Sequence, residues 1–108
     1  MSIASLLPRS VVMPVSWMLE GGVLVTGGAV RIGRAIALAL ADAGADVVVH
    51  CRHSAAEART LCTELRRKGR RAWQVSGALD TPDGVAGIFR KAVSAAGRLD
   101  GLVNNASI

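Results

Sequence analysis

The stretch that decides the fold is "VTGGAVRIGRA", residues 25–35, where an apolar run passes into a glycine-rich loop and then into a helical pattern. Gly27 permits the turn that leaves a strand, and Gly33 allows the following helix to pack close to a sheet. A helix that starts directly after such a loop presents its first free N–H groups to an anion. The stretch therefore predicts phosphate binding where a strand meets a helix.

Two common phosphate-binding motifs do not match this loop. The P-loop needs a lysine and a hydroxyl residue directly after its second glycine, whereas Arg34-Ala35 follows Gly33 here. The lysine that would hold a phosphate and the hydroxyl that would bind magnesium are both missing, which disfavours a nucleoside triphosphatase. The dinucleotide motif GxGxxG is also not matched literally. The position between a strand and a helix nevertheless favours dinucleotide binding.

Strand and helix patterns alternate from residue 22 to the end of the sequence. The predicted strands are 23–26, 47–49, 72–75 and 102–103, and the helices between them end at Gly44, Gly69 and Gly97. Ser54 and Glu57 form a capping-box pattern for the second helix, and Thr81-Pro82 is typical of a helix start. The predicted inner faces of the three helices are Ile32, Ile36, Ala39, Leu40 and Ala43; Ala58, Leu61, Cys62 and Leu65; and Val85, Ile88, Phe89 and Ala92.

This order predicts the α/β class. We expect a Rossmann-type, doubly wound parallel sheet, truncated after the fourth strand (β-α-β-α-β-α-β), with the first strand central. Right-handed crossovers would place the first two helices on one face and the third on the other. Ligands of such sheets bind at the carboxyl ends of the strands.

Composition narrows the function classes. The net charge is +5 and most of it is arginine, but the densest cluster, residues 66–71, has no aromatic residue within it and falls at a helix end. We therefore expect no nucleic-acid partner. The two cysteines form neither a CxxC motif nor a His/Cys cluster, so we expect no metal site and a reduced, cytoplasmic protein.

Residues 1–18 differ in kind from the rest. They contain two prolines and no apolar run long enough to span a membrane, so we expect no membrane partner. We interpret residues 1–18 as a disordered leader or as the result of a start assigned too early. Residues 19–108 would form a partial NADP-binding Rossmann domain.

The end of the second strand indicates which dinucleotide is bound. An NAD enzyme of this architecture carries an acidic residue there for the ribose 2′-hydroxyl, whereas residues 50–54 read "HCRHS". Asp46 lies at the opposite end of the strand. Arg52 can grip a 2′-phosphate, and the Ser54 hydroxyl can donate to it while its oxygen caps the helix. The alternative is a solvated Arg52 and a Ser54 that only caps, but the missing acid favours NADP(H).

Two motifs together resemble a known family. Residues 26–33 match the pattern Thr-Gly-x-x-x-[Gly/Ala]-x-Gly except at the sixth position, and residues 104–107 read "NNAS". Residues 19–108 thus resemble the N-terminal, cofactor-binding part of a short-chain dehydrogenase/reductase. The resemblance and the strand-end argument together give these predicted cofactor-binding residues: Gly27, Arg31, Ile32, Gly33, Arg52, His53, Ser54, Leu79, Asn104, Ala106 and Ser107.

Arg31 resembles a subfamily feature. Most members of the family have glycine at position 31. An arginine at this position resembles the pteridine reductases, in which it reaches the pyrophosphate and the substrate. Ser107 in place of a final glycine, and residues 49–58, resemble the same group. Alternatively, Arg31 only neutralises the pyrophosphate and the protein is a general 3-oxoacyl or carbonyl reductase. Ala78 stands where the family has an aspartate for the adenine, and we expect Asp80 to point elsewhere.

The resemblance also implies what this stretch lacks. The family reduces a small-molecule carbonyl or pterin with a Ser and a Tyr-x-x-x-Lys pair that lie beyond the fourth strand, and the sequence contains no tyrosine. We therefore predict no catalytic residue in this chain, and a homotetrameric parent enzyme. A non-catalytic NADP-binding module is the alternative.

Overall fold

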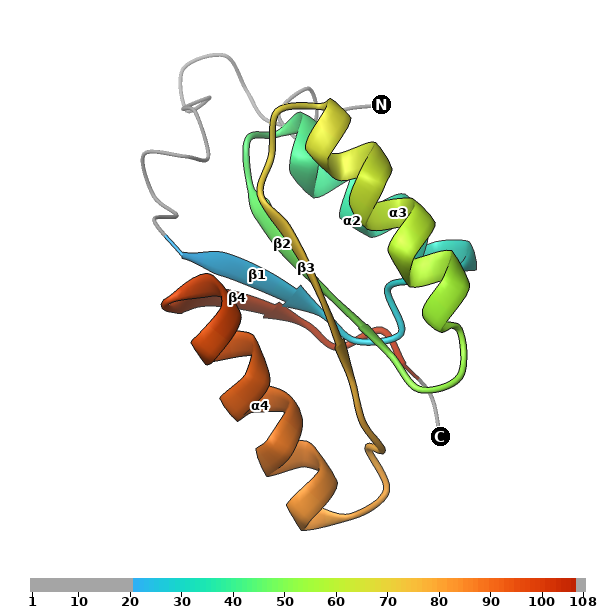
Figure 1. Ribbon diagram of the computed structural model, residues 1–108, viewed down its shortest axis with the longest axis vertical. Coiled ribbons are helices and arrows are strands. Elements are labelled where there is room, and N and C mark those ends of the chain that lie inside the picture. Colours follow the sequence, from blue (N-terminus) through green and yellow to red (C-terminus); the bar gives the residue numbers. More distant parts are fainter. Residues whose placement is uncertain (1–20, 107–108) are drawn as a thin grey trace.

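The chain folds as one parallel sheet with helices on both of its faces (Figure 1). The computed structural model describes residues 21–106, so the predicted leader at 1–18 and Ser107 lie outside the described residues. The elements are β1 (Gly22–Val25), α2 (Arg31–Asp42), β2 (Asp46–Cys51), α3 (Ala55–Arg67), β3 (Ala72–Ser76), α4 (Pro82–Ala96) and β4 (Leu99–Val103). The predicted α/β class and the order of its elements are confirmed.

The four described strands lie in the order β3-β2-β1-β4, and every neighbouring pair is parallel. β1 is central, as predicted, and Val23, Leu24 and Val25 are at most 4% exposed. A strand with apolar layers on both faces needs an uninterrupted apolar run, which β1 supplies. Because the strands are parallel, their carboxyl ends meet at one edge of the sheet.

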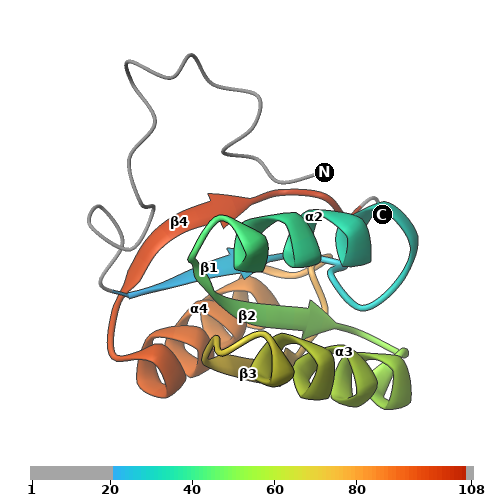
Figure 2. The same cartoon turned by 90° about the horizontal axis from the view of Figure 1, so that it is seen from above.

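The two faces of the sheet are covered unequally. α2 and α3 lie on one face and α4 lies alone on the other, as Figures 1 and 2 show. Val47 and Val49 pack in the cluster under α2 and α3, whereas Val48 packs under α4, which is the two-residue alternation of a strand. On the α4 side, Val93 and Leu102 remain 45% and 51% exposed.

The predicted inner face of the first helix was partly wrong: Ala43 is buried and Ile36 and Leu40 pack against the core, but the centre of the inner face differs. Small residues face the sheet, and the buried positions of α2 are Gly33, Ala37 and Ala41. Ile32 is 71% exposed, although its spacing had suggested an inward position. The row of small residues lets α2 approach the sheet closely, which leaves the bulkier isoleucine and leucine side chains at the flanks.

The other helices fit their predictions better. All four predicted inner residues of α3 are buried, and Ile88 and Ala92 of α4 are buried as well. Phe89 was predicted to be inside but is 36% exposed, while Ala96 takes a buried position. The glycines predicted to end helices, Gly44, Gly69 and Gly97, all have positive φ, as a left-handed helix terminus requires.

One of the two predicted helix caps is absent. Ser54 is the N-cap of α3, but its side chain makes no capping hydrogen bond, so the capping box is wrong. Thr81 is the N-cap of α4, and its hydroxyl accepts from the N–H of Gly84 at 3.0 Å, with Pro82 opening the helix as predicted. The Ser54 hydroxyl is therefore not committed to its own helix.

This difference predicts opposite sensitivities of the two caps. Thr81→Ala should lower the free energy of unfolding by about 1 kcal/mol, because it removes a capping acceptor. Ser54→Ala should change it by less than about 0.5 kcal/mol, since no capping bond is lost. Urea unfolding of both variants measures this, and equal losses would show that Ser54 does cap α3.

Candidate functional site

The start of α2 is pressed against the loop that precedes it. Gly27 has φ +62°, a left-handed conformation that glycine adopts without strain. A Cβ on Gly33 would collide with the carbonyl oxygen of Gly27 and lie 2.7 Å from the Asn105 side-chain nitrogen. Both glycines of the predicted motif are therefore required by close packing at the carboxyl edge of the sheet.

The two motifs, far apart in the sequence, are joined by hydrogen bonds. The Thr26 hydroxyl oxygen accepts from the N–H groups of Asn105 at 3.0 Å and Ala106 at 3.2 Å. The side-chain amide of Asn105 donates to the Gly27 carbonyl at 3.2 Å. The loop after β1 and the segment after β4 thus form one unit, with Asn104 and Ala106 beside the glycine loop.

His50, at the end of β2, is a residue of this site that the sequence analysis missed. It is 2% exposed, and its Nδ1 lies 3.0 Å from the Gly27 nitrogen while its Nε2 lies 2.9 Å from the Gly77 oxygen. A carbonyl only accepts, so Nε2 carries the hydrogen and Nδ1 accepts from Gly27. No local pattern signals this role, because it arises from three strand ends meeting.

The N-terminus of α2 carries no cap of its own. Its N-cap residue, Val30, provides no side-chain hydrogen bond, and the first turn contains no acidic residue. The N–H groups of Gly27 and Gly28 are used by the ring and the carbonyl of His50, respectively. The amides of the first turn, which include Ile32 and Gly33, are therefore the ones placed to receive an anion.

Arg31 opens α2 in an unusual conformation. Among the described non-glycine residues it alone has positive φ, at +53°. This region costs a side-chain-bearing residue about 1–2 kcal/mol, so glycine would fit the position better. The exposed side chain stands beside the uncapped amides, where positive charge favours a bound anion.

Arg52 lies just beyond β2, at the same edge. Its guanidinium is 3.6 Å from the Asp80 carboxylate, and both side chains are about half exposed. Such a solvated pair contributes little stability and leaves the guanidinium accessible to a stronger anion. Ser54 is partly buried and His53 exposed, next to Arg52 in the chain.

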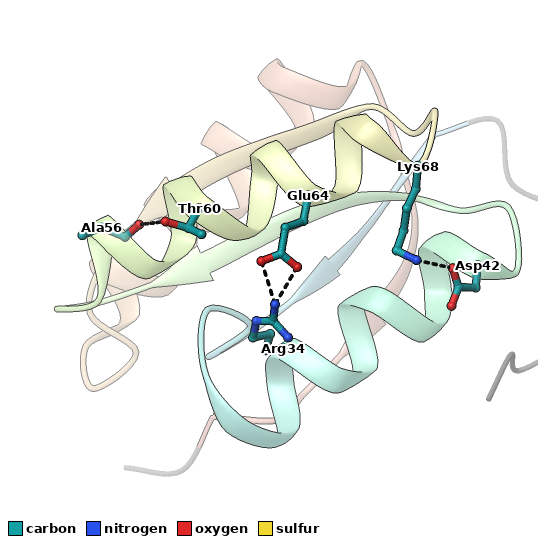
Figure 3. Close-up of polar contacts among 6 residues, drawn as sticks. All are labelled: Arg34, Asp42, Ala56, Thr60, Glu64 and Lys68. Atoms are coloured by element: carbon teal, nitrogen blue, oxygen red, sulfur yellow. Dashed lines mark hydrogen bonds and ion pairs between the residues drawn. The ribbon is translucent and has the colours of Figure 1, made fainter.

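Two cavities flank the glycine loop. One of about 440 Å³ is bounded by three of the predicted residues, Leu79, Asn104 and Ala106, together with Thr26, Val85, Phe89 and Leu102. The other, of about 510 Å³, lies between α2 and α3 and includes Arg31. Arg34 and Glu64 also line it, and Figure 3 shows the ion pair between them, with Arg34 of α2 2.5 and 2.7 Å from the carboxylate oxygens of Glu64 of α3.

The basic cluster at residues 66–71 lies at the other edge of the sheet. Lys68 pairs with Asp42 at 2.8 Å (Figure 3), and Arg71 pairs with Asp46 at 2.9 Å. Asp46 does begin β2, at the end away from the loop, as predicted. These two cations connect neighbouring helix and strand ends, and each has a carboxylate partner there.

The cysteines show no sign of reactivity. Cys51 and Cys62 are free and buried, and burial raises the pKa of both thiols above the ordinary value. Neutral, buried thiols are poor nucleophiles and poor metal ligands. Over residues 21–106 no group of His, Cys, Asp and Glu could hold a metal ion, and no helix in that range is long and apolar enough to cross a membrane.

The loop, the helix start and the strand order define a dinucleotide-binding fold of the Rossmann type, and comparison with known proteins identifies the family. The family described as short chain dehydrogenase matches residues 22–108. The chain belongs to this family.

Particular relatives are similar over most of the chain. It is 40% identical to L-rhamnose 1-dehydrogenase (NAD(P)(+)) of a Sphingomonas species over 92 residues, which is 84% of this chain and 36% of the relative. It is 39% identical to the Staphylococcus aureus 3-oxoacyl-[acyl-carrier-protein] reductase FabG over 79% of this chain and 35% of the relative.

A solved structure supports the same assignment. FolM alternative dihydrofolate reductase 1 of Brucella canis, crystallised with NADP, is 38% identical, with a TM-score of 0.77 over 84% of this chain and 37% of that one. The chain thus spans little more than a third of the length of these relatives.

From the close packing of the loop we predict opposite changes in stability when alanine replaces two helical glycines, Gly33 and Gly87. Gly33→Ala should destabilise the fold by about 1–3 kcal/mol, because the added methyl group has no space. Gly87→Ala, in α4, is the matched control, since its Cβ would meet only the Arg90 side chain at 3.8 Å. That control should gain about 0.5–1 kcal/mol from the helical preference of alanine. Thermal or urea unfolding tests the opposite signs, and a stabilising Gly33→Ala would contradict the packing argument.

Proposed function

We propose that this chain is the cofactor-binding part of an NADP(H)-dependent oxidoreductase that reduces a small carbonyl or pterin substrate. One observation carries the proposal: an uncapped helix N-terminus and Arg52 lie at the same carboxyl edge, where the strand end lacks the acid typical of NAD enzymes. The arrangement offers amides to a pyrophosphate and a guanidinium to a 2′-phosphate.

The residues present fit a dinucleotide of this kind. The amides of Ile32 and Gly33 in the first turn of α2 would receive the pyrophosphate, with Arg31 beside them. Arg52, with His53 and Ser54, would hold the 2′-phosphate, and the free Ser54 hydroxyl leaves a donor for it.

The adenine end would be held mainly by apolar contact. Leu79 would line the adenine pocket. Ala78 stands where the family has an aspartate, so no carboxylate would hydrogen-bond the adenine there. Asn104, Ala106 and Ser107 would complete the site, and Asn104 and Ala106 bound the same cavity as Leu79.

The chemistry of the reaction divides between cofactor and protein. NADPH supplies the hydride when it is bound. The chain's own residues would bind and orient the nucleotide. The glycine loop carries no bulky side chain where the phosphates would approach the backbone. No described residue has the geometry of a proton donor paired with a lysine, and the sequence has no tyrosine. We therefore propose that proton transfer depends on residues outside this stretch.

Two substrate classes remain, and each has an observation in its favour. The NADP-bound FolM neighbour and Arg31 favour a pterin, because the arginine lines a cavity next to the phosphate-binding amides. The identity to FabG favours a 3-oxoacyl substrate. Assays of the complete polypeptide with a dihydropterin and with a 3-oxoacyl thioester distinguish them. A purely nucleotide-binding role would show affinity without turnover of either substrate.

The wider setting of the protein is also a proposal. Two buried, free thiols suit a reducing compartment, so we propose a cytoplasmic protein. A homotetramer is proposed for the parent enzyme by analogy with the family, which size-exclusion chromatography with light scattering would test. Residues 19–108 would form the cofactor domain.

The sharpest prediction concerns the choice of nucleotide. Arg52→Asp should weaken NADPH binding roughly 10- to 100-fold and leave NADH binding unchanged or tighter, because it removes charge-assisted hydrogen bonds to the 2′-phosphate. Arg67→Asp makes the same charge change at the far end of α3 and should alter the ratio of the two affinities by less than about 2-fold. Fluorescence titration of wild type and both variants with each nucleotide gives the dissociation constants that this comparison needs.

Two outcomes would contradict the assignment. A wild-type preference for NADH would remove the NADP(H) proposal directly. An equal loss in both arginine variants would show that Arg52 acts only through general charge, and the 2′-phosphate would then need another partner.

Arg31 yields a prediction in which stability and binding move in opposite directions. Arg31→Gly should raise the free energy of unfolding by about 1 kcal/mol, because glycine adopts the positive φ freely. The same change should weaken both nucleotides about equally, since the pyrophosphate is common to them. Denaturation and titration of one preparation measure both effects. Unchanged affinity would leave the strain at Arg31 without a role in cofactor binding.

A further inference from the structure

We infer that His50 is a positioning residue for the nucleotide: its Nδ1 fixes the Gly27 amide of the glycine loop, and its Nε2–H anchors the ring to the Gly77 carbonyl. The inference rests on the proposed function and goes beyond it, because His50 itself would not touch the nucleotide. The ring is 2% exposed and lies under the loop, between the ends of β1, β2 and β3.

The contacts of His50 reach both neighbouring connections. Its Nδ1 accepts from the Gly27 N–H at 3.0 Å, and its carbonyl oxygen accepts from the Gly28 N–H, also at 3.0 Å. Its Nε2–H donates to the Gly77 carbonyl at 2.9 Å, in the segment that leads from β3 to Leu79. One residue thus holds two consecutive amides of the loop and one carbonyl of the next connection.

The Gly27 peptide groups are held from two sides. Their N–H is bound by His50, and their carbonyl accepts from the side-chain amide of Asn105. Glycine has more backbone freedom than any other residue, so a loop built on it needs such external restraints to keep one conformation. The restraint turns the Gly27 and Gly28 amides toward the sheet, which reserves the amides of the α2 first turn for the anion.

The two ring nitrogens can be tested separately with amide side chains. The Oδ1 atom of asparagine lies as many bonds from the backbone as Nδ1 of histidine, so His50→Asn keeps an acceptor for Gly27. The Nε2 atom of glutamine corresponds to Nε2 of histidine, so His50→Gln keeps a donor for Gly77. Each variant loses one of two buried hydrogen bonds, and His50→Leu loses both.

The experiment compares these three variants with wild type in the complete polypeptide that contains this chain. Dissociation constants for NADPH and NADH are measured beside urea unfolding. His50→Asn should bind within about 3-fold of wild type, whereas His50→Gln and His50→Leu should bind both nucleotides roughly 10-fold more weakly, as the loss of a buried hydrogen-bond acceptor implies. The two nucleotides should lose affinity equally, since the loop faces their shared pyrophosphate.

The outcomes separate positioning from a structural role. If affinity follows stability across the variants, so that the asparagine and glutamine variants are weakened alike, His50 only supports the fold and the inference is overturned. A folded His50→Leu variant with wild-type affinity overturns it as well. If His50→Leu fails to fold, the comparison of asparagine with glutamine still decides. A wild-type protein that binds neither nucleotide removes the proposed function itself, and the inference with it.

Discussion

The site depends on close packing of backbone groups around Gly33, which is possible because glycine has no side chain. The helix start, the loop after β1 and the segment after β4 meet there at distances that no Cβ could satisfy. Backbone groups therefore come close enough for Asn105 to bind the Gly27 carbonyl and for Thr26 to bind two amides. Small residues along the rest of the inner face of α2 extend the same close approach into the core. The positions of the backbone groups at the phosphate-binding edge thus follow from packing alone.

Charge then distinguishes the two edges of the sheet. At the amino edge two cations lie at ion-pair distance from carboxylates, Lys68 from Asp42 and Arg71 from Asp46. At the carboxyl edge the first turn of α2 has no acid, and Arg52 has only a long, solvated contact with Asp80. Helix N-termini add partial positive charge at this edge. The carboxyl edge therefore presents the amides of a helix start and an accessible guanidinium to an anion.

Much of this could be predicted from the sequence, because the decisive signals are local. Apolar runs, glycine helix ends and the Thr26–Gly33 motif specify the strands, the helices and their order. The inner face of α2 could not be predicted from hydrophobicity alone, since close approach favoured alanine over isoleucine at the sheet. The unused cap at Ser54 and the bridge made by His50 depend on where other strand ends fall, which spacing along one chain does not reveal.

Arg31 and the uncapped start of α2 are two locally unfavourable features, and they occupy the same turn. A non-glycine residue at φ +53° costs folding energy, and this helix start lacks the stabilisation that a side-chain N-cap would give. A bound pyrophosphate would compensate both, because it accepts from the amides and pairs with the guanidinium that the strained backbone holds nearby. Folding stability at this turn would then be coupled to nucleotide binding, since a ligand that binds only the folded form stabilises it. Because His50 already binds the amides of Gly27 and Gly28, that coupling would act through the first turn of α2.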